Sequence, residues 1–203
     1  MSKTILSRFP LLLFTFLLLF SANSYAVIGL PENTARYGMA LGSAQIDIDE
    51  PDGGSPQASS TVPINLIVTD WLVSGSRYWL ELFHVKNSYQ ASETIVGQNI
   101  RHTTLRAYIQ KNLKVSPKFS PWLGAGLTVS QTRYSTRHTE ASDGYLLQKL
   151  DDRSSNTLGF VINAVVDWEV KRNWFAGLKA DQTFNFGNNL NARGAAMYFL
   201  YLY

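Results

Sequence analysis

Long segments in which apolar and polar side chains alternate run through most of this chain of 203 residues. From Trp174 to Phe186, apolar residues occupy most even positions, whereas Lys179, Asp181 and Thr183 occupy odd ones. A period of two places the two sets on opposite faces of a β-strand and does not fit a helix. The pattern predicts eight strands, at about 37–49, 61–73, 77–90, 98–113, 119–135, 155–169, 174–186 and 193–203. These segments are longer than the five or six residues usual in soluble sheets and suit strands that cross a membrane at a tilt.

The predicted connections alternate between short and long. Short turns are expected at 74–76, 114–118 and 170–173. Longer loops are expected at 50–60, 91–97, 136–154 and 187–192. Short turns at one end and longer loops at the other are typical of membrane barrels, whereas alternation alone would also fit a soluble barrel turned inside out.

The tryptophans favour the membrane alternative. All five lie within about four residues of a predicted short turn, as expected of an aromatic belt at one membrane interface. This predicted girdle consists of Trp71, Trp79, Trp122, Trp168 and Trp174.

The last predicted strand carries aromatic residues at alternate positions, Phe199, Tyr201 and Tyr203. Chain ends are commonly polar and frayed, so an apolar final strand needs a special reason. A barrel provides one, because its last strand pairs with its first and leaves no open edge. We therefore expect the final strand to pair with the first and close a ring.

Two stretches resemble known proteins. The ending is similar to the C-terminal sorting signal of bacterial outer-membrane β-barrels, which the barrel-assembly machinery reads. This resemblance implies that Phe199, Tyr201 and Tyr203 form an assembly signal. The run Pro121-Trp-Leu-Gly-Ala-Gly126 resembles a segment of small outer-membrane barrels of the OmpA-, OmpX- and OmpW-like kind. The resemblance implies an all-β, eight-stranded antiparallel up-and-down transmembrane barrel in a Gram-negative outer membrane. It also implies lipid and lipopolysaccharide as surroundings, and the assembly machinery as a partner during biogenesis.

The N-terminal region has the pattern of a secretory signal peptide, predicted over residues 1–26. Lys3 and Arg8 precede an apolar core at 10–20, which is shorter than the roughly 20 residues of a membrane-spanning helix. Ser24-Tyr-Ala26 provides a small-x-small cleavage site. A periplasmic lead-in at 27–36 and a barrel domain at 37–203 are expected to follow.

Composition excludes several classes of function. The chain has no cysteine, so neither a disulfide nor a thiolate metal site is expected. The formal net charge of +3 falls when Lys3 and Arg8 are removed with the signal peptide, so nothing points to nucleic acid. We expect no cofactor and no metal, and we expect a monomer.

Charged residues on the predicted inner faces are the main candidates for function. They are Asp47, Glu81, Arg106, Asp167, Glu169, Lys179 and Asp181. An eight-stranded barrel is just wide enough for side chains to fill it, and opposite charges inside must pair. A salt-bridged plug is therefore predicted, in a structural or surface-interaction protein with loops 50–60 and 136–154 as recognition surfaces. The alternative is a narrow channel for small or hydrophobic solutes, similar to the OmpW-like kind, with Arg106 at a gate.

Two further sets of residues suggest lipid chemistry. His102 and Thr104 share one face of a strand, which resembles the His-x-Ser pair of the lipid A deacylase family, although no carboxylate partner can be assigned. A lipid A-modifying enzyme is thus the third hypothesis, and no catalytic residue is assigned. Guanidinium groups pair well with phosphate, so arginines near the outer rim are candidates for lipopolysaccharide contact. These are Arg101, Arg133, Arg137 and Arg153.

Overall fold

The computed structural model describes residues 35–48, 57–73, 75–114, 121–186 and 190–203. The predicted signal peptide, most of the predicted lead-in and parts of the predicted loops lie outside these residues, so those predictions stay predictions. Within the described ranges, no helix is both long and apolar enough to cross a membrane.

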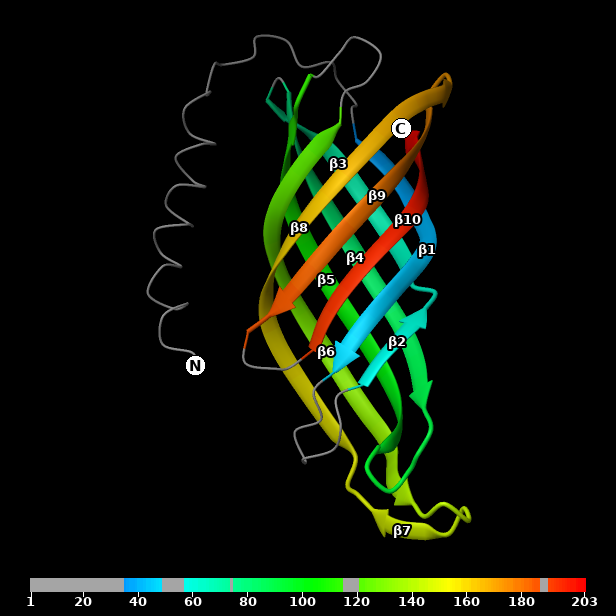
Figure 1. Ribbon diagram of the computed structural model, residues 1–203. Helices are drawn as coiled ribbons and strands as arrows, with labels where there is room; N and C mark the ends of the chain where they lie inside the picture. The colour runs from blue at the N-terminus through cyan, green and yellow to red at the C-terminus, as the bar shows by residue number, and fades with distance from the viewer. Residues whose placement is uncertain (1–34, 49–56, 74, 115–120, 187–189) are drawn as a thin grey trace. The chain divides into compact units, whose positions relative to one another are not determined.

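The described residues form ten β-strands, of which nine occupy eight positions around one closed sheet and one, β7, lies outside it (Figure 1). The strands are β1 (Arg36–Ile48), β2 (Gln57–Thr61), β3 (Ile64–Val73), β4 (Ser76–Tyr89), β5 (Gly97–Asn112), β6 (Trp122–Glu140), β7 (Leu146–Lys149), β8 (Arg153–Lys171), β9 (Trp174–Asn185) and β10 (Leu190–Leu202). Neighbours pair antiparallel in the order β10-β9-β8-β6-β5-β4-β3-β1, and β1 pairs again with β10. The predicted eight-stranded antiparallel up-and-down barrel is confirmed.

Two strands, β2 and β3, lie end to end beside β1 and together occupy one position of the ring. β2 and β3 both pair with β1 in one continuous register, with Ala44 opposite Thr61 and Leu41 opposite Ile64. Only Val62 and Pro63 separate them, and proline has no N–H to donate to a neighbouring strand. Residues 57–60 were expected in a loop, and that prediction is wrong because β2 already pairs with β1 before the proline.

β7 lies outside the ring and pairs with the far end of β6. β6 runs on to Glu140 and β8 begins at Arg153, so much of the predicted loop 136–154 is an extended ribbon rather than an irregular loop. Backbone pairing of β6 with β7 does not require apolar and polar residues to alternate, which explains why this segment gave no strand signal. The ribbon projects beyond the other strands (Figure 1). We call this the loop end of the barrel, and the opposite end, where β1 begins and β10 ends, the turn end.

The strand register sets the width of the barrel. From Tyr201, successive cross-strand partners lead through Tyr37, Val68, Leu80, Ala107, Leu127, Phe160 and Phe184 to Asn191. The path returns to β10 ten residues from its start, which is a shear of ten. With standard strand spacings, eight strands and this shear give a tilt of about 41° and a radius of roughly 8 Å. Such a lumen holds side chains and little else.

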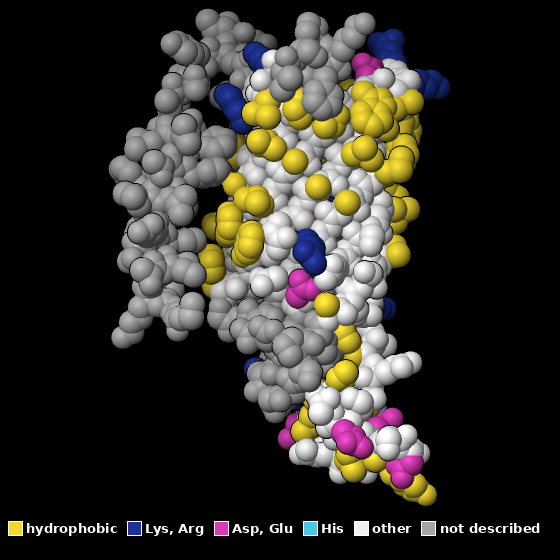
Figure 2. Space-filling view, viewed as in Figure 1, with side chains coloured by type: hydrophobic (Ala, Val, Ile, Leu, Met, Phe, Trp, Pro, Cys, Tyr) yellow, Lys and Arg dark blue, Asp and Glu magenta, His cyan; other side chains and the backbone are white. Residues whose placement is uncertain are grey.

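The two faces of the wall differ in chemistry. Large apolar side chains are exposed on the outward face; they include Met39, Leu41, Leu66, Leu82, Leu105, Leu127, Leu158, Leu178 and Met197. Figure 2 shows hydrophobic side chains spread over the wall facing the viewer and acidic ones around the projecting ribbon. A soluble monomer does not expose an apolar surface of this extent, so this wall faces lipid.

Aromatic side chains fill the lumen toward the turn end. Tyr198 lies directly across from Gly177, where any β-carbon would overlap the tyrosine ring. The ring of Tyr198 packs edge-on against Trp79, with centroids 5.3 Å apart. Gly177 is therefore required as the space that lets Tyr198 lie flat across the sheet.

Candidate functional site

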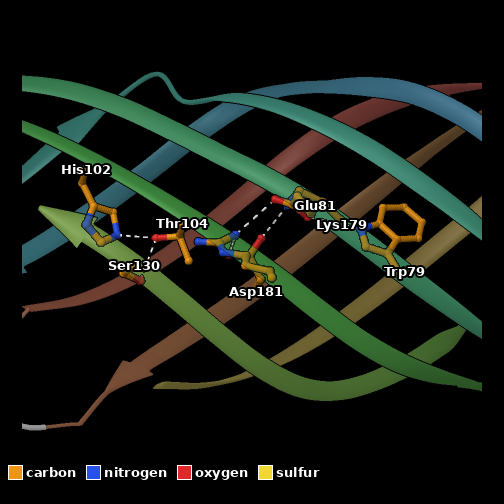
Figure 3. A network of polar contacts seen from close by, with 8 residues as sticks. Trp79, Glu81, His102, Thr104, Ser130, Lys179 and Asp181 are labelled. Carbon is orange, nitrogen blue, oxygen red and sulfur yellow. Dashed lines mark hydrogen bonds and ion pairs between the residues drawn. The ribbon is translucent and has the colours of Figure 1, made fainter. Parts of the chain in front are cut away.

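Four charged side chains form one network in the middle of the lumen (Figure 3). Arg106 Nη1 lies 3.2 Å from Glu81 Oε1 and 2.9 Å from Asp181 Oδ1. Lys179 Nζ lies 2.6 Å from Glu81 Oε1 and 2.8 Å from Asp181 Oδ2. Each cation thus contacts both carboxylates, and the four formal charges cancel.

Alternation along each strand turns these residues inward, and closure of the ring brings residues of distant strands together. Glu81 and Arg106 are direct cross-strand partners on β4 and β5. Lys179 and Asp181 come from β9, which is not adjacent to either strand in the ring. The network therefore joins opposite walls across the lumen, with all four side chains at most 5% exposed. The Arg106 guanidinium also lies 4.0 Å from the centroid of the Phe83 ring.

A second charged cluster lies nearer the turn end. Asp167 on β8 accepts from Arg77 Nη1 at 2.6 Å and from Trp122 Nε1 at 3.1 Å, and Arg36 Nη1 lies 3.8 Å away. Arg77 Nε donates to Gln110 Oε1 at 2.6 Å, and its guanidinium lies 4.2 Å from the Trp122 ring centroid. This cluster joins side chains of β1, β4, β5, β6 and β8 nearer the turn end.

On the loop side of the central network, an imidazole and hydroxyl groups form a third layer (Figure 3). His102 Nδ1 hydrogen-bonds with the Thr132 hydroxyl at 2.8 Å, and Nε2 with the Thr104 hydroxyl at 2.7 Å. Thr104 also hydrogen-bonds with Ser130 at 2.9 Å. Both ring nitrogens of His102 thus contact hydroxyls, and no described carboxylate orients the ring, so the arrangement favours packing over activation of a nucleophile. Nor does any group of three or more histidine or acidic residues in the described ranges have the arrangement of a metal site.

The structure unites some of the predicted lumen residues and separates others. Asp47 is on the outward face, because Ala40, Ala44 and Ile46 are the buried residues of β1. Its carboxylate accepts from Gln45 Nε2 at 2.9 Å. A shift of one residue in strand parity exchanges the two faces, which is why the prediction for Asp47 is wrong. Glu169 is exposed at the turn end of β8 and lies outside the network, so that assignment is also corrected.

The predicted tryptophan girdle is only partly placed on the lipid side. Trp168 and Trp174 are each 48% exposed on the outer wall, and Trp174 packs against Tyr201. Trp79 and Trp122 are buried in the lumen, and Trp71 packs against Trp122 with ring centroids 5.2 Å apart. For these three residues the girdle assignment is wrong, because nearness to a turn sets the height of a side chain and not its face.

Strand parity carried the missing information. Trp79 is two residues from Glu81, and both must point the same way. By the same reasoning Arg77 also faces inward, where the structure shows it buried against Asp167. A consistent parity along Arg77-x-Trp79-x-Glu81 would have predicted all three lumen residues.

The other predicted site residues are exposed, with one exception. Arg101, Arg133 and Arg153 are exposed. Arg137 is buried and donates to Gln98 Oε1 at 3.2 Å and to the Asp151 carbonyl at 3.1 Å, so its assignment to the lipid-contact set is corrected. Phe199 and Tyr201 are exposed on the outward face of β10, and Tyr203 is exposed after its end.

No family model matches the chain, and no curated protein matches it. Several solved structures, however, are similar to it in fold. Neisserial surface protein A aligns over 83% of this chain and 99% of its own, with 12% identity and a TM-score of 0.57. Ail, the attachment invasion locus protein of Yersinia pestis, covers 84% and 99%, with 9% identity and a TM-score of 0.52. The outer membrane protein OprG of Pseudomonas aeruginosa covers 84% and 94%, with 11% identity and a TM-score of 0.53.

These likenesses concern the fold, and the outer surface of the molecule agrees with them. The pairing of β1 with β10 closes the sheet into a ring, as lipid requires, and the exposed apolar wall suits a bilayer and not water. The chain therefore has the fold of the eight-stranded bacterial outer-membrane β-barrels, with an outer wall suited to lipid.

Proposed function

We propose that this protein is a closed outer-membrane barrel with a structural or surface-interaction role, and not a channel. The observation that supports this proposal is the central network of Glu81, Arg106, Lys179 and Asp181, which links opposite walls of the lumen. Separating a buried charge from its partners is strongly unfavourable, and in this network each cation contacts two carboxylates. Passage of a solute would require all four contacts to break together.

The layers on either side of the network add to this barrier. Toward the turn end, Asp167 pairs with Arg77, and toward the loop end, His102 hydrogen-bonds with Thr104. A radius of roughly 8 Å leaves no open path once side chains fill it. Three successive layers support a plugged lumen better than a single constriction would.

The projecting ribbon supports a role at the surface. At its tip, Tyr145, Leu146 and Leu147 are 74%, 61% and 57% exposed. They lie beyond the apolar wall of the barrel, at the end of the extension of β6 (Figure 1). Exposed apolar side chains that stand apart from the lipid-facing wall are typical of contact surfaces. We assign the recognition role expected of segment 136–154 to this tip.

Single-channel recording in a planar bilayer tests the closed lumen. We expect refolded wild-type protein to be silent, with folding verified by its heat-modifiable mobility on a gel. Arg106→Gln and Lys179→Gln are the matched variants. Conductance steps in the variants alone would identify the network as the barrier, whereas discrete steps in the wild type would overturn the proposal.

A narrow channel is the second candidate, and unpaired polar atoms in the lumen favour it. Asn163 Oδ1 and Nδ2, Thr128 Oγ1 and Thr183 Oγ1 are buried and have no hydrogen-bond partner among the described residues. Such atoms ordinarily bind water, so a thread of water on both sides of the network would satisfy them. A conducting wild type whose steps change on neutralising Arg106 would favour this candidate.

A further inference from the structure

Three basic side chains lie side by side on the outward wall. Lys86 on β4 is directly opposite Arg101 on β5, and Arg101 is directly opposite Arg133 on β6. All three are exposed. Among the described residues, no hydrogen bond or ion pair joins any of these side chains to a partner. We call this set the cationic row.

The rows on either side of the cationic row are neutral. Toward the turn end lie His84, Thr103 and Gln131, and toward the loop end lie Ser88, Asn99 and Ser135. Within these rows His84 Nδ1 hydrogen-bonds with Thr103 at 2.8 Å, and the Ser88 hydroxyl donates to Asn99 at 2.6 Å. The cations therefore have hydrogen-bonding neighbours and no adjacent carboxylate on these three strands.

Their height on the barrel matches a lipid headgroup. Two rows toward the turn end, the same strands carry the exposed apolar row of Leu82, Leu105 and Val129. Each step between rows is two residues, or about 5 Å along the membrane normal at this tilt. The cationic row thus lies about 10 Å beyond the last apolar row on these strands, where the hydrocarbon gives way to headgroups.

Like charges directly opposite one another destabilise a sheet, so an uncompensated row needs an anion. Two of the three residues are arginines, whose planar forks hold phosphate through paired hydrogen bonds. A headgroup with one phosphate would bridge two cations, and a headgroup with two would occupy the whole row.

We propose that Lys86, Arg101 and Arg133 form a binding site for the phosphate groups of an anionic lipid in the leaflet at the loop end. Compared with the arginines expected from the sequence, the site keeps Arg101 and Arg133 and adds Lys86. It omits the buried Arg137, and also Arg153, which shares its face of β8 with the inward Val161. The site lies on the outer wall and does not depend on whether the lumen is closed.

Measuring how much lipid the protein retains tests this proposal. Protein refolded in phosphatidylcholine nanodiscs is offered bis-phosphorylated lipid A or its dephosphorylated form, and retained lipid is counted by native mass spectrometry. We expect the wild type to prefer the phosphorylated form by about tenfold or more, and the preference to fall with added salt. The variant K86Q/R101Q/R133Q should lose the preference.

A variant with the same loss of charge at the turn end, K111Q/K171Q/R172Q, is the matched control and should retain it. Equal retention of both lipids by the wild type, or equal loss in both variants, would overturn the site. If inorganic phosphate alone raises the unfolding temperature of the wild type as much as the phosphorylated lipid does, the site takes free phosphate and the lipid assignment is wrong. Should the triple variant fail to refold, R101Q alone removes the middle cation and must already weaken the preference.

Discussion

At the scale of single residues, Glu81 is the hub of the lumen. Its carboxylate accepts from Arg106 and Lys179 through Oε1 and from Trp79 Nε1 through Oε2 at 3.2 Å. The side chain is fully buried, so these contacts replace all of the water it would otherwise bind. Asp181 alone would have to balance two cations if Glu81 were removed.

Glu81→Ala should destabilise the barrel by roughly 3–5 kcal/mol, because it leaves a buried positive charge without compensation. The midpoint of urea unfolding in lipid vesicles measures the change. Glu169→Ala is the control, since that side chain is exposed at the turn end and should change stability by less than about 0.5 kcal/mol. Equal midpoints for the two variants would show that the central ion pairs do not hold the walls together.

At the scale of elements, the ribbon of β6, β7 and β8 is separate from the barrel it extends. Its β7 residues are all exposed, so they share no buried surface with the lumen. The base of the ribbon pairs with β5, with Gly97 opposite His138, and beyond it the ribbon is held by the pairing of β6 with β7, with His138 opposite Lys149. An element of this kind is free to carry a contact surface without affecting the fold beneath it.

Replacing residues 139–148 with Asn-Gly should leave the barrel intact. The exchange joins His138 to Lys149 through a two-residue turn that suits a hairpin. We expect unchanged heat-modifiable mobility and an unchanged urea midpoint, with loss of the exposed tip at Tyr145 to Leu147. Failure to refold would mean that the ribbon is part of the folding unit. A matched variant that keeps the ribbon but carries Leu146→Ser and Leu147→Ser separates loss of the tip from loss of the element.

At the scale of the whole molecule, closure of the ring creates two separate environments. The central network is inside, and the cationic row is outside on the same two strands, β4 and β5. Glu81 and Lys86 are five residues apart on β4 and point to opposite faces. Alternation along a strand thus lets one segment serve the lumen and the lipid independently.

This separation predicts that the two sets of variants act on different properties. Glu81→Ala should leave the preference for phosphorylated lipid unchanged, and K86Q/R101Q/R133Q should leave the bilayer silent. Sites without shared contacts ordinarily behave additively, so the combined variant should show the sum of the two unfolding effects. A deviation well above about 0.5 kcal/mol would reveal coupling through the wall.

Much of the fold could be predicted from local pattern. A period of two over long segments defines strands, and turns of a few residues make successive strands antiparallel neighbours, as for β8 and β9. Parity also predicted that Arg106, Lys179 and Asp181 face inward, and applied consistently it would have added Arg77 and Trp79. The apolar outward wall followed from the same alternation.

Tertiary structure decided the rest. The sequence by itself could not show that Lys179 of β9 reaches Glu81 of β4, because only the closed ring brings those strands face to face across the lumen. It could not place Asp47, whose face depends on the strand register, nor align Lys86 with Arg101 and Arg133. Alternation is a property of one strand and is written in its residues, whereas partnership between strands depends on register and closure, which belong to the whole sheet.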